Sequence, residues 1–371
     1  MGQAQYRQAR RGERHLFIGA KGSGKSAIFR MLGEELTGQR QILVRISPAE
    51  FEFPRLAAVF DEYFSEARWE FVYGSFWRFI FLTEILRAAR EDFLDFLLQE
   101  SGRMDRSGTE EEYAKRLVEW LRANGDVLDL DFASRVRWTI GRLGEIGGTA
   151  VERLEACEAL LQHARLYEIE RHLRTLATKY EIWFLIDDLD RTWSPENSAS
   201  EHLLISMLNE LHRIQEAFDG NLQAVTCLRR DVFRWLRIND AEILRRDPTE
   251  LDWTDAALEE LIAQRLSAGG GIPSGLRPID LWLQYFPAYV DDQTILDFVL
   301  SRTHRRARDV ILFCREALAL AQAANRQVNT SDLEAAWATT GGYVLAQIGL
   351  EREFSHPGAA GLGNDLAWQA R

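Results

Sequence analysis

Eight residues near the N-terminus have the spacing G-x-x-x-x-G-K-[ST] of a phosphate-binding loop, or P-loop: Gly19-Ala-Lys-Gly-Ser-Gly-Lys-Ser26. Gly22 and Gly24 allow positive φ and a close approach of the backbone to a phosphate. Lys25 is placed to reach the β- and γ-phosphates of a nucleotide, and the Ser26 hydroxyl to bind Mg²⁺. The predicted nucleotide contacts of this loop are Gly19, Lys21, Gly22, Ser23, Gly24, Lys25 and Ser26.

The segments on either side of the loop support this interpretation. Residues 15–18 form a short apolar run typical of a strand, and after Ser26 the apolar residues Ile28, Met31 and Leu32 follow at helical spacing. A strand, a glycine loop and a helix N-terminus direct several N–H groups at one point, which suits a polyphosphate. The alternative is a glycine-rich turn that binds no ligand.

A cluster of carboxylates follows a later apolar run and has the Walker B arrangement. Residues 182–186 are all apolar, which favours a strand covered on both faces of a parallel sheet. Ligands bind beyond the carboxyl ends of such strands. Asp187 is therefore predicted to hold Mg²⁺, directly or through water, and Asp188 to orient or deprotonate an attacking water. Asp190 is a rival of Asp188 for this role in positioning water. Alternatively, Asp190 caps the following helix.

Composition and charge restrict the class of protein. The chain has 371 residues, 46% of them hydrophobic and 27% charged, which are globular values with room for two domains. The three cysteines and seven histidines lack metal-ligand spacing. The most apolar stretch, residues 71–86, is too short to cross a bilayer and contains Arg78 and Glu84. We expect a cytoplasmic protein with no membrane segment.

The order of predicted elements indicates an α/β fold with a helical interruption. Further strands are expected at 41–47 and 221–229, and a helix at 198–218. Residues 51–178 lack strand patterns; helices are expected there at 76–100, 110–123 and 164–179, with loops at 101–109 and 141–149.

The C-terminal part has a different pattern. After a short extended segment near Glu250, a helix is expected to begin at Thr254 or Asp255, followed by a Gly/Pro loop and then helices only. The predicted organisation is a P-loop core at 1–50 and 179–250, a helical insertion at 51–178, an all-helical lid at 251–345 and a disordered tail at 346–371.

Two pairs of arginines are candidates for stabilising phosphate charge. Arg229 and Arg230 end a strand that we expect beside the Walker B strand, close to a γ-phosphate. Their alternative is an ion pair with Asp231 or another acid. Arg306 and Arg308 lie at the start of a lid helix. This basic run has two other interpretations, a nucleic-acid contact and a solvated charged surface.

Taken together, the G-A-K-G-S-G-K-S loop, the D-D-L-D-R segment, the R-R-D-V-F strand end and the R-x-R-D-V-I-L-F helix resemble bacterial P-loop ATPases of the KAP and STAND groups. These groups are related to AAA+ and origin-recognition ATPases. The resemblance covers the core and the lid but not the insertion. The resemblance implies an ASCE-type core that binds ATP with Mg²⁺. It also implies a signalling switch, often in defence against phage, in which the nucleotide state controls oligomerisation.

Two departures from that pattern bear on function. Asp188 stands where many relatives have Glu, which implies slow hydrolysis, and no effector domain is recognisable. We expect a slow ATPase acting as a switch, with a homo-oligomer in one nucleotide state and a protein partner or effector. The alternatives are a DNA-associated AAA+-like ATPase, which the net charge of −12 disfavours, and a non-hydrolysing nucleotide-binding module. The sequence leaves ATP versus GTP open and shows no acceptor site for a phosphotransferase.

Overall fold

The computed structural model describes residues 3–38, 40–47, 69–90, 125–145, 164–189, 198–239, 248–270 and 275–355, with a few short stretches between 58 and 156. The expected loop at 101–109 and most of the expected helix at 110–123 lie outside the described residues.

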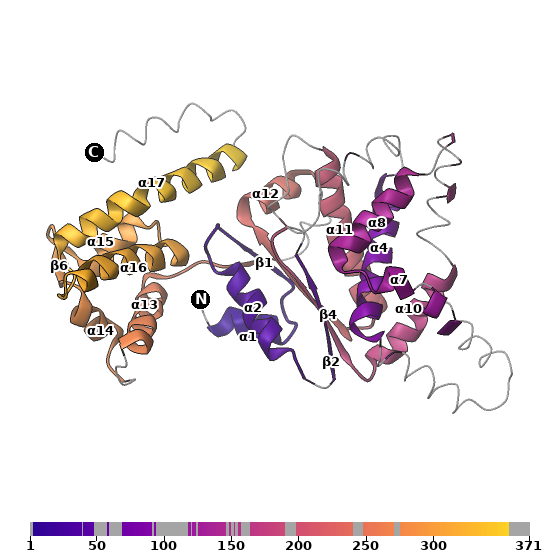
Figure 1. The fold of residues 1–371 in the computed structure, drawn as a ribbon, viewed down its shortest axis with the longest axis horizontal. Coiled ribbons are helices and arrows are strands. Elements are labelled where there is room, and N and C mark those ends of the chain that lie inside the picture. Colours follow the sequence, from indigo (N-terminus) through magenta and orange to yellow (C-terminus); the bar gives the residue numbers. More distant parts are fainter. Residues whose placement is uncertain are drawn as a thin grey trace.

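Five parallel strands form the central sheet, in the order β2-β3-β4-β1-β5 (Figure 1). All the strands expected from the sequence are present. Thr226 of β4 is paired with Leu16 of β1 on one side and with Ile186 of β3 on the other. One strand therefore separates the strand that enters the glycine loop from the strand that ends at Asp187. The strands are β1 Leu16–Gly19, β2 Gln41–Ile46, β3 Glu181–Ile186, β4 Leu222–Arg229 and β5 Thr249–Glu250.

Helices cover both faces of this sheet, as the continuous apolar run of β3 predicts. Because side chains of a strand alternate between faces, Phe184 packs in a core with helices α4 and α11, whereas Trp183 and Leu185 pack with helices α1 and α2. Figure 1 shows α1 and α2 on one side of the sheet and α4 and α11 on the other. The covering helices are α1 Gln3–Arg10, α2 Lys25–Glu35, α4 Trp69–Ala88, α11 Ser198–Ala217 and α12 Arg230–Asn239.

The described part of the insertion is helical, but its boundaries differ from the sequence prediction. Helix α8 was not expected, and the loop predicted at 141–149 is wrong over its first residues because α8 continues to Gly144. Its start is set by Asp131, whose side chain accepts a 2.7 Å hydrogen bond from the Ser134 N–H. Helix α4 begins before the predicted residue 76. The other helices of the insertion are α7 Gly125–Leu128, α8 Phe132–Gly144 and α10 Ala164–Ala177.

The C-terminal part forms a helical domain with its own core, which includes Trp282, Phe298 and Phe313. The predicted helix start is confirmed, because the Thr254 hydroxyl accepts a hydrogen bond of 3.2 Å from the Ala257 N–H. The elements of this domain are α13 Asp255–Gly270, α14 Pro278–Tyr285, β6 Tyr289–Val290, β7 Gln293–Thr294, α15 Ile295–Arg302, α16 Ala307–Ala323 and α17 Thr330–Ser355.

Two expectations for this region are wrong. The prediction of helices alone fails at β6 and β7, an antiparallel hairpin whose turn residues Asp291 and Asp292 have φ of +46° and +59°. Aspartate tolerates this left-handed conformation, which two-residue hairpin turns need. The tail does not begin at 346, because α17 continues to Ser355 and no proline interrupts it before Pro357. Residues 356–371 lie outside the described residues.

Candidate functional site

The glycine loop joins β1 to α2 in a conformation that only its glycines adopt without strain. Strand β1 ends at Gly19, and α2 begins at Lys25. Gly22 has φ +85°, and Gly24, which caps α2, has φ +102° and ψ +12°. An L-residue in these conformations costs about 1–2 kcal/mol. The strand, loop and helix N-terminus are therefore arranged as the P-loop pattern predicts.

Lys25 is buried and directed back under the loop. Its Nζ donates hydrogen bonds of 3.0 Å to the carbonyl oxygens of Gly19 and Ala20. These bonds fix the ammonium charge against the inner side of the loop. Ser26 is exposed in the first turn of α2, where its hydroxyl is open to a ligand. Lys21 lies in the middle of the loop and is half-buried.

Ser23 contributes a buried hydroxyl that has no hydrogen-bond partner among the described residues. Its backbone N–H closes the turn by donating to the Ala20 carbonyl at 3.1 Å. A Cβ at Gly19 would lie 2.3 Å from the Ser23 Oγ, so the first glycine of the motif is required for this hydroxyl to fit. Leaving a hydroxyl buried and unpaired costs roughly 1–3 kcal/mol, which a ligand oxygen would recover.

The predicted acids follow β3 at the carboxyl end of the sheet. Asp187 is buried, and its N–H donates to the Ile46 carbonyl of β2 at 3.1 Å. Asp188 is half-buried and has φ +61°, so the chain turns sharply out of the strand at this residue. Non-glycine residues seldom adopt this left-handed φ, and those that do are often found at functional sites. Asp190 lies outside the described residues.

The two strand-end arginines are both bound to carboxylates. Arg229 lies opposite Gly19 in the sheet register, and its Nε donates to Asp231 Oδ1 at 3.0 Å while an Nη binds the second oxygen. Arg230 turns toward β5, where its Nη2 lies 3.2 Å from Glu250 and also binds Asp252. The ion-pair alternative foreseen from the sequence is thus present for both arginines.

Helix α16 brings Arg308 against the loop. The Arg308 N–H donates to the Gly22 carbonyl oxygen at 3.2 Å. Its guanidinium is held by Asp309, whose Oδ1 accepts from Nε at 3.1 Å, and lies over the ring of Tyr343 with 5.3 Å between Cζ and the ring centroid. The Arg308 Nη2 is buried without a hydrogen-bond partner among the described residues. Arg306, the other candidate, is the N-cap residue of α16 and is half-buried.

Two further residues at the loop were not predicted. The indole N–H of Trp253 donates to the Ser23 carbonyl at 2.7 Å. Asp309 is fully buried, and its second oxygen, Oδ2, has no partner among the described residues. Because the indole N–H of a tryptophan packed inside a protein usually finds a hydrogen-bond acceptor, Trp253 in the segment leading into α13 could have been predicted from the sequence to bind a backbone carbonyl. The loop is therefore bonded to the C-terminal region at two carbonyls, those of Gly22 and Ser23.

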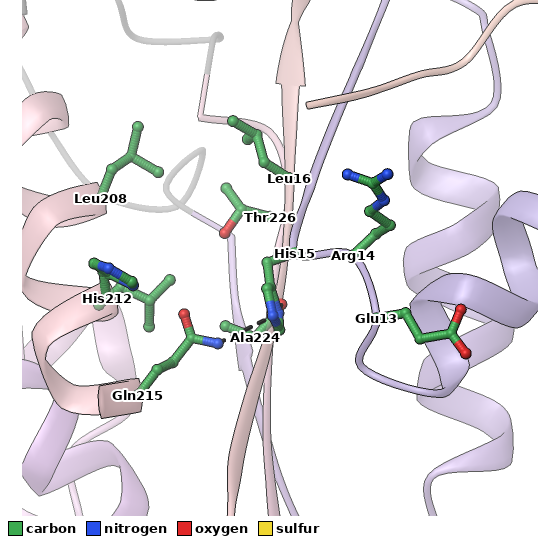
Figure 2. A pocket seen from close by; sticks show the side chains of 10 residues that line it. Glu13, Arg14, His15, Leu16, Leu208, His212, Gln215, Ala224 and Thr226 are labelled. Atoms are coloured by element: carbon green, nitrogen blue, oxygen red, sulfur yellow. Dashed lines mark hydrogen bonds between the residues drawn. The ribbon is translucent and has the colours of Figure 1, made fainter. Parts of the chain in front are cut away.

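A cavity of about 210 Å³ lies away from this loop, at the start of β1 and between the sheet and α11 (Figure 2). None of the residues predicted for nucleotide binding lines it. Its lining residues are Glu13, Arg14, His15, Leu16, Leu208, Leu211, His212, Gln215, Ala224 and Thr226.

Comparison with known families finds a match in the C-terminal region. Residues 256–347 match the model of a FunZ-associated C-terminal helical domain. The match extends from α13 into α17 and so includes α16, the helix bonded to the glycine loop. Searches of curated proteins and of solved structures return no match for the chain. Within the described residues, every helix is too short or too polar to cross a membrane.

Proposed function

We propose that this chain binds ATP with Mg²⁺ at the loop of residues 19–26 and hydrolyses it slowly. The observation that carries the proposal is the conformation of this loop, with two left-handed glycines, a helix that begins at Lys25 and the Lys25 ammonium fixed beneath it. The strand order β2-β3-β4-β1-β5 supports the proposal that the core is of the ASCE type, the class of P-loop fold that the sequence resemblance implies.

The chemical tasks of phosphate transfer have candidate residues at this edge of the sheet. Lys25 and the N–H groups of the loop bind the phosphates and stabilise negative charge on them. Asp188, at the strained turn after β3, orients or deprotonates the water that attacks the γ-phosphate. Asp190 remains a rival for this task.

The predicted Mg²⁺ ligands have the right chemistry. The Ser26 hydroxyl and the Asp187 carboxylate are hard oxygen donors, and Mg²⁺ is usually bound through one or two protein oxygens together with phosphates and water. The unpaired Ser23 hydroxyl inside the loop also fits a site that takes a phosphate ligand. When bound, Mg²⁺ would neutralise charge on the β- and γ-phosphate oxygens.

Among the four candidate arginines, we assign phosphate contact to Arg308. Arg229 and Arg230 bind carboxylates, whereas the Arg308 N–H donates to the Gly22 carbonyl of the loop. Arg308 Nη2 is buried without a hydrogen-bond partner among the described residues, as is Arg230 Nε, so the assignment rests on the contact of Arg308 with the loop. A guanidinium donates several N–H groups in a rigid fork, and one left unpaired in a buried position suits an anionic oxygen. The helical domain would then act as a lid whose position depends on the nucleotide.

The biological role that we propose is a cytoplasmic signalling or defence switch of the KAP/STAND type. In that role the nucleotide state, sensed through the contact of α16 with the loop, would control assembly into a homo-oligomer or the engagement of an effector protein. The test is phosphate release and light scattering by the full chain with ATP, with and without duplex DNA, comparing wild type, Lys25→Ala and Asp188→Asn. Lys179→Ala, an exposed lysine remote from the loop, is the matched control.

The outcomes separate the proposed role from its alternatives. Turnover that needs Lys25 and accompanies ATP-dependent assembly would support the switch, and Asp188→Asn should retain ATP binding while losing turnover. Turnover that is unchanged in Asp188→Asn would contradict its catalytic role. Strong stimulation by DNA would favour a nucleic-acid ATPase, and ATP binding without turnover would leave a binding module. Equal ATP binding by wild type and Lys25→Ala would overturn the proposed nucleotide site.

A further inference from the structure

The side chain of Trp253 joins the core of the helical domain to the glycine loop. Its ring packs against the apolar cluster that includes Trp282, Phe298 and Phe313. Its indole N–H donates a hydrogen bond of 2.7 Å to the Ser23 carbonyl oxygen. A tryptophan has a large apolar ring and a single donor group, and in this chain the two contact different parts of the molecule.

The backbone that carries Trp253 is held in register with the strand that enters the loop. Strand β5 is paired in parallel with β1, with Glu250 opposite Ile18. The Leu251 N–H donates to the Ile18 carbonyl oxygen at 2.8 Å, and the Leu251 side chain is buried in the same core as α2. Trp253 follows two residues later, so its indole reaches the loop from a fixed starting point.

Some carbonyl oxygens of the loop are bound from within and others from outside. Lys25 binds the first two, and the α2 backbone binds that of Gly24. Those of Gly22 and Ser23 are bound from outside, by the C-terminal region. The bond to Gly22 comes from the backbone of α16, whereas the bond to Ser23 comes from a side chain and depends on the residue type at position 253.

The bond to Trp253 also sets the direction of a neighbouring donor. In a planar trans peptide, the C=O of Ser23 and the N–H of Gly24 point in opposite directions. Because the carbonyl oxygen faces Trp253, the Gly24 N–H points away from it, and no described residue accepts a hydrogen bond from this N–H. Gly24 has φ +102° and no side chain to restrict its rotation, so the peptide can turn over when the indole is removed.

We propose that Trp253 is a positioning residue of the nucleotide site, whose indole holds the Ser23–Gly24 peptide with the Gly24 N–H directed at a phosphate oxygen. This inference rests on the proposed function for the identity of the ligand. A helical domain that moves away from the core withdraws the indole from Ser23 and frees the peptide. Because Gly24 is at the N-terminus of α2, where N–H groups bind anions, phosphate binding then weakens.

The test compares Trp253→Phe with Trp282→Phe in the full chain. Both changes remove an indole N–H bound to a carbonyl and shrink a ring that packs in the helical domain, but the Trp282 indole binds Glu259 of α13, at 3.0 Å. Hydrogen exchange of residues 19–28 in the nucleotide-free protein reports on the loop, and calorimetry with Mg·ATP gives the affinity.

Trp253→Phe should speed exchange in the loop and weaken ATP binding about three- to tenfold, the usual effect of one hydrogen bond. Trp282→Phe should lower the unfolding temperature and leave both loop measurements at wild-type values. In ¹⁵N-labelled wild type, which needs no substitution in the protein measured, the indole N–H signal of Trp253 should exchange slowly with deuterated water. Rapid exchange of that signal would overturn the proposal.

The other outcomes separate this role from its alternatives. Wild-type loop exchange in Trp253→Phe would overturn the proposal, as would faster exchange with unchanged ATP affinity. Equal effects of both substitutions would also overturn it, because a general loosening of the helical domain would explain them. If wild type binds no ATP while only Trp253→Phe speeds loop exchange, the hold of Trp253 on the loop is supported and the proposed nucleotide function fails.

Discussion

The backbone N–H of Arg308, in the first turn of α16, donates a hydrogen bond of 3.2 Å to the carbonyl oxygen of Gly22 in the glycine loop. The indole of Trp253 binds the neighbouring carbonyl of Ser23 at 2.7 Å. Because both acceptors belong to the loop backbone, any movement of the loop toward a phosphate changes bonds to the C-terminal region. The predictions that follow test this connection and the stability of the parts around it.

Replacing Gly22 with alanine should weaken ATP binding about tenfold. The residue has φ +85°, which costs an L-residue about 1–2 kcal/mol, and the new Cβ would lie 3.0 Å from the Arg308 Cβ. The measurement is nucleotide affinity by calorimetry. Gly269→Ala is the matched control, because a Cβ there meets nothing within 4 Å and its affinity should equal that of wild type. Normal affinity in Gly22→Ala would show that the loop tolerates the change and that its glycine geometry is not needed.

Arg308→Ala should lower ATP turnover about 100-fold while changing the affinity for ATP much less, as expected of a group that stabilises developing phosphate charge. The control is Arg305→Ala in the same basic segment, since Arg305 forms an exposed pair with Asp255 and should leave turnover unchanged. Phosphate release and ATP titrations measure the two quantities. Equal losses in the two variants would indicate a general effect of the basic segment on the fold.

Asp309 should act through Arg308. Its Oδ1 accepts from the Arg308 Nε at 3.1 Å and so fixes the direction of the guanidinium. In a double-mutant cycle of turnover, Asp309→Asn should therefore cost little once Arg308 is already alanine. Independent, additive losses would contradict this positioning role.

Breaking the pair between Arg135 and Glu84 should strongly destabilise the helical insertion. Both side chains are 0% exposed, with Nη1 and Oε1 2.8 Å apart. Arg135→Met would leave the buried Glu84 carboxylate with Arg87 as its one remaining cationic partner among the described residues, and should cost about 3–5 kcal/mol. Urea unfolding of the full chain measures this loss. The double variant Arg135→Met with Glu84→Leu should recover much of the stability, and an equally unstable double variant would contradict the charge argument.

The N-terminus of α17 should lose stability in acid through Asp332. Its carboxylate accepts hydrogen bonds from the Arg326 guanidinium and from the Asn329 N–H at 3.0 Å, and these contacts lower the Asp332 pKa. A lowered pKa stabilises the folded state above the unfolded value of about 4, and this stability is lost as the pH falls through the folded value. At pH 7, Asp332→Asn should cost about 1 kcal/mol, the value of a helix cap.

Hydrogen exchange of the α17 amides at several pH values checks this prediction. The difference between wild type and Asp332→Asn should shrink steadily as the pH falls from about 4 toward the lowered folded pKa of Asp332, because the carboxylate is protonated first in the unfolded chain and only below the folded value in the native state. A difference that stays constant down to pH 2 would show that shape, and not charge, sets the contribution of Asp332.

The central sheet and the loop could be predicted because their signals are local. The run of β3, Ile182 to Ile186, is apolar at every position, and the structure covers it on both faces. Helix α8 had no predicted counterpart at 132–140, and Gly141 was taken as a loop residue, whereas the packing of Val136 and Ile140 in the core keeps the helix intact through Gly141. Propensity is a weak preference that tertiary contacts override.

The sequence by itself determined the glycine loop, the carboxylates after β3 and the parallel strands, since each depends on backbone preferences or periodicity within a few residues. Only the tertiary structure distinguished Arg308 from Arg306 and Arg229, and paired Trp253 with Ser23. Those contacts join segments far apart in the chain, and neighbouring arginines have the same chemistry. Their roles depend on the direction in which each helix or strand presents them, which is decided when separate elements pack around a shared core.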